Sequence, residues 1–257
     1  MNARNDMNKV AEITVYFWVM KILATTLGET SGDFLSMTLG LGYILSLAIT
    51  TGFFLVMLII QLKSQKFHPV FYWAVIVGTT SVGTEISDLM DRTLGWGYKT
   101  GSLVLCACLF LTLGFWYYKE KNLNVYPIFG KKELFYWFAV LFSNSLGTAF
   151  GDFLSDNMGL SFLGGALVCA GIIALVIGLH YFTRINRILL FWIAFVFTRP
   201  FGATFGDLLT KPIVKGGLNL GTLNASTVTV ILLALVLIYT HRESIKVRFR
   251  TVEGDIE

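Results

Sequence analysis

Four long stretches of the sequence contain no Asp, Glu, Lys or Arg, and they restrict the fold more than any other feature. They are residues 34–62, 100–118, 157–183 and 216–241. Each supplies about the 20 apolar residues that an α-helix needs to cross a bilayer. Hydrophobic residues make up 55% of the chain and charged residues only 14%, well below the charged share of a soluble domain. The sequence therefore predicts a polytopic, all-α membrane protein.

A pattern of Trp, Gly and Asp occurs four times. In every copy a Gly stands ten residues after the Trp, a second Gly or a Ser fourteen after it, and an Asp fifteen after it. The copies begin at Trp18, Trp73, Trp137 and Trp192. The intervals between them are 55, 64 and 55 residues, so the units form two larger halves offset by 119 residues. Each unit contains the motif-bearing segment and then a second segment that is more uniformly apolar. Four such units predict eight transmembrane helices in one domain.

The expected helices cover residues 12–34, 39–62, 69–90, 99–118, 134–155, 160–182, 188–209 and 217–240. The repeats cover residues 12–66, 67–125, 131–185 and 186–241, and a tail of basic and acidic residues follows at 242–257. Because Glu12 and Lys21 interrupt the first segment and no small-residue cleavage site follows it, we interpret it as a retained helix. Each unit crosses the membrane twice, so the four repeats are expected to be parallel.

The distribution of Lys and Arg predicts the orientation. The loops on one side carry 14 of these residues, from Arg4 to Arg250, and those on the other side carry 4. By the positive-inside rule both termini are cytoplasmic, and the basic part of the tail is expected to lie against anionic lipid headgroups. This bias also accounts for the formal charge of +4 without a nucleic-acid partner.

The four Trp residues with their Gly and Asp companions resemble a family of bacterial membrane proteins built from a two-helix unit repeated four times. The resemblance covers about residues 12–240. It implies the repeat architecture and a multi-pass protein of the bacterial inner membrane. The family is catalogued as a repeat of unknown function, so the resemblance brings no substrate.

Polar residues line one face of the first, third and fifth expected helices, and the seventh keeps the outer half of this stripe. Positions 8, 11, 15 and 18 after each Trp share a helical face. They hold Thr26, Glu29, Asp33 and Ser36; Ser81, Thr84, Asp88 and Asp91; Ser145, Thr148, Asp152 and Ser155; and Pro200, Ala203, Asp207 and Thr210. A carboxylate facing lipid costs several kcal/mol. These four helices are therefore expected to form an inner set, with the other four outside.

Small residues on the neighbouring face predict close contacts between the inner helices. They are Gly28, Gly32, Gly83, Gly147, Gly151, Gly202 and Gly206, with Ser87 in the second unit. The repeated Trp lies near the cytoplasmic end of each inner helix, where an aromatic belt at the lipid headgroups is the ordinary interpretation.

Acidic residues outnumber bases in the outer half of the inner set. The acids are Glu29, Asp33, Glu85, Asp88, Asp91, Asp152, Asp156 and Asp207, and the nearby bases are Lys21, Arg92, Arg199 and Lys211, which leaves a surplus of four acids. Hard oxygen ligands suit Mn²⁺, Mg²⁺ or Ca²⁺. We expect a metal site at Glu29, Asp33, Glu85, Asp88 and Asp152, with Asp91, Asp207, Arg199 and Lys21 also taking part in ion or substrate binding. The leading hypothesis is a secondary transporter of a divalent cation, with proton coupling.

Other functions stay open. Arg199 could take the carboxylate of a small organic cation or zwitterion while the acids take its ammonium group. The aspartates could instead cap helices, or pair with Lys21 and Arg199 in a static polar core, as in a scaffold without transport activity.

No G-x-S-x-G, H-E-x-x-H or P-loop motif is present, and the three cysteines form no metal or disulfide pattern, so we expect neither an enzyme nor a bound cofactor. The expected partners are the lipid bilayer and the transported solute, with a homo-oligomer as a further open alternative.

Overall fold

The computed structural model describes the backbone of residues 8–254 and the side chains of residues 8–243. This part of the chain folds into eight α-helices with no β-strand. The helices are α1 (Val15–Asp33), α2 (Gly42–Lys63), α3 (Pro69–Asp88), α4 (Gly97–Glu120), α5 (Lys132–Asp152), α6 (Phe162–Phe182), α7 (Arg187–Thr210) and α8 (Thr222–Gly254). Helix α8 thus extends past residue 240, where we expected it to end. Arg4 and the side chains of most of the predicted tail lie outside the described residues.

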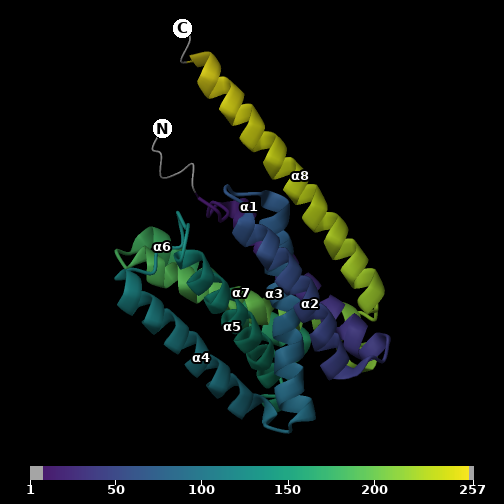
Figure 1. Cartoon of the computed structure of the whole chain (residues 1–257). Coiled ribbons are helices and arrows are strands. Elements are labelled where there is room, and N and C mark those ends of the chain that lie inside the picture. Colours follow the sequence, from purple (N-terminus) through teal and green to yellow (C-terminus); the bar gives the residue numbers. More distant parts are fainter. Residues whose placement is uncertain (1–7, 255–257) are drawn as a thin grey trace.

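The odd-numbered helices form a closed ring inside the molecule. Helix α1 packs against α3 and α7, and α5 packs against the same two helices. Each even-numbered helix packs on the next odd one, so that α2 covers α3, α4 covers α5 and α6 covers α7. Helix α8 returns to cover α1, and Figure 1 shows it running along one edge and continuing past the other helices. The polar stripes on the odd helices explain this order, because only the inner positions shield them.

Within residues 8–254, six helices are long and apolar enough to cross a membrane, namely α2, α4, α5, α6, α7 and α8. Only 11–22% of the apolar segments of the even helices is buried within the protein, against 61% for α5 and α7. Helices α1 and α3 are not among the six, because their polar residues lower their hydropathy. The further two spans and the cytoplasmic position of both termini stay predictions.

Three of the odd helices end in the same way. A π-helical turn follows α1 (η1, Phe34–Thr38), α3 (η2, Leu89–Thr93) and α5 (η3, Phe153–Asn157). The repeated Asp is the last α-helical residue in each case. A glycine in the left-handed region then reverses the chain, as at Gly40 (φ +67°) and Gly95 (φ +69°). Helix α7 differs: it runs without a π-helical turn to Thr210, and a 3₁₀ turn follows (η4, Ile213–Lys215). Because π-helical turns are frequent at functional sites, the repeated Asp positions are candidates for such a site.

The repeated Trp residues lie inside the protein. Trp73, Trp137 and Trp192 are buried, and Trp18 is half-buried. An aromatic belt facing the lipid is therefore wrong for the three buried residues. The residue before each Trp is also aromatic and buried; these are Phe17, Tyr72, Tyr136 and Phe191. The hydroxyl groups of Tyr72 and Tyr136 lie 2.5 Å apart. Tilted and edge-on aromatic side chains thus fill this end of the ring of odd helices.

An N-terminal segment packs against the same end. The Lys9 ammonium donates to the buried carboxylate of Glu133 at 2.7 Å, and the Lys9 amide donates to the carbonyl of Ile128 at 3.0 Å. Val10 is buried in the hydrophobic core. A cavity of about 620 Å³ lies beside this segment and includes Trp73 in its lining, but none of the repeated aspartates.

Candidate functional site

The repeated glycines place the odd helices in direct contact. The first glycine of each repeat lies against the residue seven positions after the Trp of the next repeat. The pairs are Gly28 with Thr80, Gly83 with Asn144, Gly147 with Arg199, and Gly202 with Thr25. The last pair returns to the first repeat, so the four contacts close the ring. The second small residue follows the same rule one turn later, where Gly32 meets Thr84, Gly151 meets Ala203 and Gly206 meets Glu29. Without Cβ atoms at these positions, the backbones approach closely.

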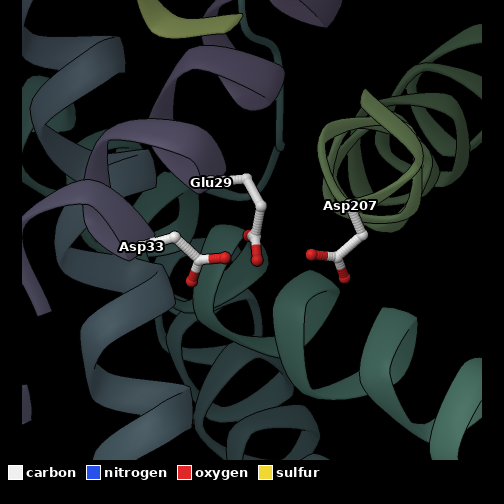
Figure 2. Close-up of side chains that lie close together, drawn as sticks. All are labelled: Glu29, Asp33 and Asp207. Carbon is white, nitrogen blue, oxygen red and sulfur yellow. The ribbon is translucent and has the colours of Figure 1, made fainter. Parts of the chain in front are cut away.

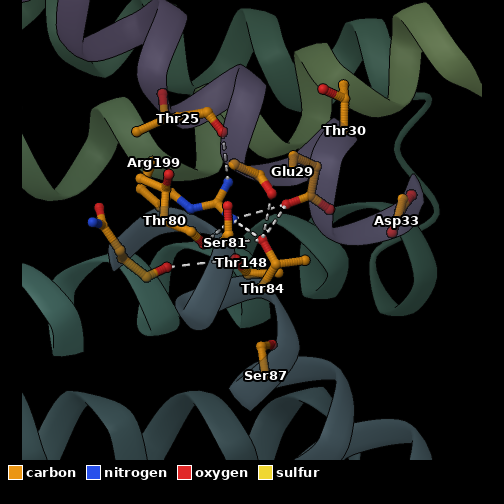
Figure 3. A network of polar contacts seen from close by, with 12 residues as sticks. Thr25, Glu29, Thr30, Asp33, Thr80, Ser81, Thr84, Ser87, Thr148 and Arg199 are labelled. Carbon is orange, nitrogen blue, oxygen red and sulfur yellow. Dashed lines mark hydrogen bonds and ion pairs between the residues drawn. The ribbon is translucent and has the colours of Figure 1, made fainter. Parts of the chain in front are cut away.

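Arg199 lies in the middle of this ring with no exposed surface. Its guanidinium group donates to Glu29 Oε2 at 2.9 Å and to Thr84 Oγ1 at 2.5 Å. It also donates to the backbone carbonyl of Thr25 at 3.3 Å. Figure 3 shows these contacts converging from α1, α3 and α7. One side chain therefore links three of the four repeats, and the charge of Glu29 has a buried partner.

Lys21 is also fully buried, but its partners are neutral. Its ammonium group donates to Asn144 Oδ1 at 2.9 Å and lies 4.2 Å from the centroid of the Phe195 ring. Asn144 in turn donates to Thr79 Oγ1 at 2.9 Å. The structure does not place Lys21 with the acidic residues, because it lies about two helical turns closer to the Trp end than Glu29. A role of Lys21 in ion binding stays a prediction.

Three buried carboxylates meet beyond Arg199. Glu29 and Asp33 on α1 and Asp207 on α7 each have a carboxylate oxygen within 4.8 Å of the others. Figure 2 shows the three carboxylates pointing toward one another across the contact between these helices. Among the described residues this is the group of acids close enough to share a metal ion. It contains two of the five predicted metal ligands, and it brings in Asp207, which we expected only to support them.

Two bases each bridge two of the repeated aspartates. The Lys211 ammonium lies 2.5 Å from Asp33 and 3.1 Å from Asp207. The Arg92 guanidinium lies 3.2 Å from Asp88 and 3.6 Å from Asp152. Each base therefore joins its own repeat to the next odd helix, α7 to α1 and α3 to α5. These contacts hold Asp88 and Asp152 together, and neither belongs to the group at Glu29, Asp33 and Asp207.

From the sequence, Arg92 and Lys211 stand out only as nearby bases. Both lie nineteen residues after the Trp of their repeat, so they occupy equivalent positions in the two halves of the chain. Their bridges are accordingly equivalent contacts in the two halves of the chain. The shared spacing is the signal that could have assigned them to the site.

The remaining two acids differ from each other. Glu85 has no exposed surface, and neither of its carboxyl oxygens has a hydrogen-bond partner within the described part of the chain. Asp91 points away from the ring and packs against Gly101 of α4, where the Ser87 hydroxyl donates to it at 3.4 Å. The Asp91 side chain thus lies at the contact between α3 and α4, and its part in ion binding stays a prediction.

Comparison with known proteins identifies the repeated unit. The family model named Repeat of Unknown Function (DUF347) matches four successive segments, residues 16–67, 71–122, 135–186 and 190–245. No curated protein and no solved structure matches the chain. The four matches cover most of the sequence and repeat in step with the ring of odd helices. The chain therefore belongs to the Repeat of Unknown Function (DUF347) family.

Proposed function

We propose that this protein is a secondary transporter that moves a divalent metal cation, such as Mn²⁺ or Mg²⁺, across a membrane. The observation that carries the proposal is the group of three buried carboxylates at Glu29, Asp33 and Asp207. Burying charges is costly unless they are compensated, and within the described residues these three acids form ion pairs only with Arg199 and Lys211. A divalent cation supplies the missing charge, and carboxylate oxygens are the ligands that hard cations prefer.

Lys211 occupies the place where such a cation would contact Asp33 and Asp207. Its side chain is 21% exposed, and it follows the last residue of α7, so it can move aside without breaking the helix. The two carboxylates can then exchange one cation for another. Arg199 has no comparable freedom, because it is fully buried and holds Glu29 from the other side.

The distribution of Lys and Arg supports a location in the bacterial inner membrane with both termini in the cytoplasm. In that orientation the acidic group lies in the outer half of the membrane. The exposed apolar side chains of the even helices would then contact lipid. Coupling to protons is part of the proposal, because a carboxylate releases its cation when it gains a proton.

Removal of one carboxylate should greatly weaken transport. We expect Asp33→Asn and Asp207→Asn to lower the affinity for Mn²⁺ by about 10–100-fold, the range seen when a metal site loses a supporting group. The measurement is Mn²⁺ flux into proteoliposomes, with and without a pH gradient. Asp156→Asn is the matched control, because Asp156 is exposed at the same end of the molecule.

The same assay tests the alternatives. If the folded protein transports neither Mn²⁺, Mg²⁺ nor Ca²⁺, the proposal is wrong. Flux of choline or another organic cation without metal flux would favour the second hypothesis of the sequence analysis. The contact between Arg199 and Glu29 weighs against that hypothesis, because the guanidinium group is already occupied. Full activity of both Asn variants would favour a scaffold or a different route.

Removal of the competing lysine should strengthen metal binding. We expect Lys211→Met to lower the Kd for Mn²⁺ by about tenfold, which corresponds to about 1.4 kcal/mol of lost competition. The variant should melt at a lower temperature than the wild type without metal and show a larger increase when Mn²⁺ is added. Lys215→Met, four residues further along in η4 and exposed, serves as the control. An unchanged Kd in Lys211→Met would show that the lysine does not compete for the site.

A further inference from the structure

Glu85 is a buried acid with no base of its own among the described residues. It lies on α3 and has no exposed surface, and both of its carboxyl oxygens lack a hydrogen-bond partner within that part of the chain. The other acids near it differ in this respect, since Glu29 pairs with Arg199 and Asp33 pairs with Lys211. An ionised carboxylate in such a place would be strongly unfavourable, and a group in this situation becomes neutral instead.

The Glu85 side chain lies beside the acidic group. A Cβ atom added to Gly32 of α1 would lie 3.3 Å from Glu85 Oε1, and Gly32 directly precedes Asp33. The Ser36 hydroxyl of η1 lies near the Glu85 carboxyl group, but its hydrogen bond goes to the Gly32 carbonyl at 2.9 Å. The side chain is therefore held between α3 and the segment that carries two of the three clustered acids.

The surrounding charges oppose a charge on Glu85. Asp33 and Glu29 repel it, and Arg92 attracts it from the turn after α3. Arg92 is already shared between two of the repeated aspartates. The surrounding charges therefore favour an uncharged Glu85 carboxyl group as long as the three clustered acids contact only Arg199 and Lys211 and no metal ion.

Only the second repeat has an acid at this position. Glu85 stands twelve residues after its Trp, and the equivalent residues in the other repeats are Thr30, Ala149 and Thr204. The repeated fold thus tolerates a small or hydroxyl side chain here, and the acid is not needed to build the ring. A single such group can hold a single proton.

We propose that Glu85 is a proton-binding site that exchanges its proton for the metal cation. This inference rests on the proposed function and adds the coupling step to it. A divalent cation bound at Glu29, Asp33 and Asp207 reduces the repulsion that these acids exert on a charge at Glu85. The Glu85 carboxyl group then becomes a carboxylate and its proton passes to water. When the proton returns, Glu85 loses the negative charge that attracts the cation, so the affinity for the cation falls and the cation is released.

Infrared spectroscopy of the purified protein tests the first half of the proposal. The wild type without metal should show the carbonyl band of a protonated carboxyl group, and this band should decrease when Mn²⁺ is added. Glu85→Gln should lack that component, and Asp156→Asn should keep it. If Glu85→Gln does not fold, Glu85→Thr replaces it, because the first and fourth repeats carry Thr at this position. An identical band in the wild type and the Glu85 variant would overturn the proposal.

Proton release tests the second half. In weakly buffered solution, Mn²⁺ should release about one proton more from the wild type than from Glu85→Gln. Calorimetry measures the binding of Mn²⁺ separately. It therefore distinguishes a failure of the proton exchange from a failure of the proposed function. If Mn²⁺ binds and both proteins release equal numbers of protons, the exchange is wrong and the metal site stands. If Mn²⁺ does not bind to the wild type, the proposed function fails and the exchange fails with it, whatever the infrared band shows.

Discussion

Replacement of Arg199 by Met is expected to lower the free energy of unfolding by about 3–5 kcal/mol, the cost of removing one partner from a buried ion pair. The guanidinium group has no exposed surface and contacts Glu29, Thr84 and the Thr25 carbonyl. Without it the Glu29 carboxylate would lie buried beside two other acids with no base of its own. The three repeats that Arg199 joins would also lose their shared contact.

A double variant separates the charge from the packing. Arg199→Met combined with Glu29→Gln should recover most of the lost stability, because no buried carboxylate is then left without its partner. Thermal unfolding in detergent, followed by circular dichroism, is the measurement. Arg184→Met, in the exposed loop before α7, is the control and should match the wild type. If the single Arg199 variant is as stable as the wild type, the ion pair does not stabilise the fold.

The inner position of the odd helices follows from the sequence for a simple physical reason. Four copies of a polar stripe beside small residues can be shielded from lipid only if the stripes face one another. The fifteen-residue interval from Trp to Asp also places the repeated Asp residues at similar depth. These features depend on helical periodicity and on spacing within one repeat, which the sequence displays directly.

The pairing of side chains between helices does not follow from the sequence, because it depends on how the ring closes and how each helix is rotated. Asp207 meets the acids of α1 only because α7 lies next to α1. Asp91 continues the polar stripe three residues after Asp88, yet its side chain faces Gly101 on α4. Lys21 meets an Asn on α5, a helix that lies far away in the sequence. Such partners are fixed by tertiary packing.

The location of the repeated Trp side chains could not be predicted from the sequence either. An amphipathic ring near the end of a membrane helix can face lipid headgroups or pack inside the bundle, and one sequence does not distinguish the two. The aromatic residue before each Trp favours the interior, because two adjacent rings lie on different sides of a helix and both are buried in three of the repeats.

Replacement of Gly83 by Ala is expected to destabilise the protein by about 1–3 kcal/mol, the usual cost of forcing a methyl group into a packed contact. The added Cβ would lie 2.9 Å from the backbone nitrogen of Ser145 and 3.0 Å from the carbonyl carbon of Asn144. Both are backbone atoms of α5, so the clash cannot be relieved by rotating a side chain. Helices α3 and α5 would have to separate, which would also lengthen the contact of Arg92 with Asp152.

Gly171→Ala provides the matched control for this prediction. Gly171 lies on the outer helix α6, is exposed, and has no atom within 4 Å of an added Cβ among the described residues. The same substitution there should leave the melting temperature unchanged or raise it slightly, because Ala favours a helix over Gly by about 1 kcal/mol. Equal effects of the two substitutions would show that helix propensity alone governs them and that the odd helices do not meet at Gly83. A loss of stability confined to Gly83→Ala would support the close ring on which the acidic site depends.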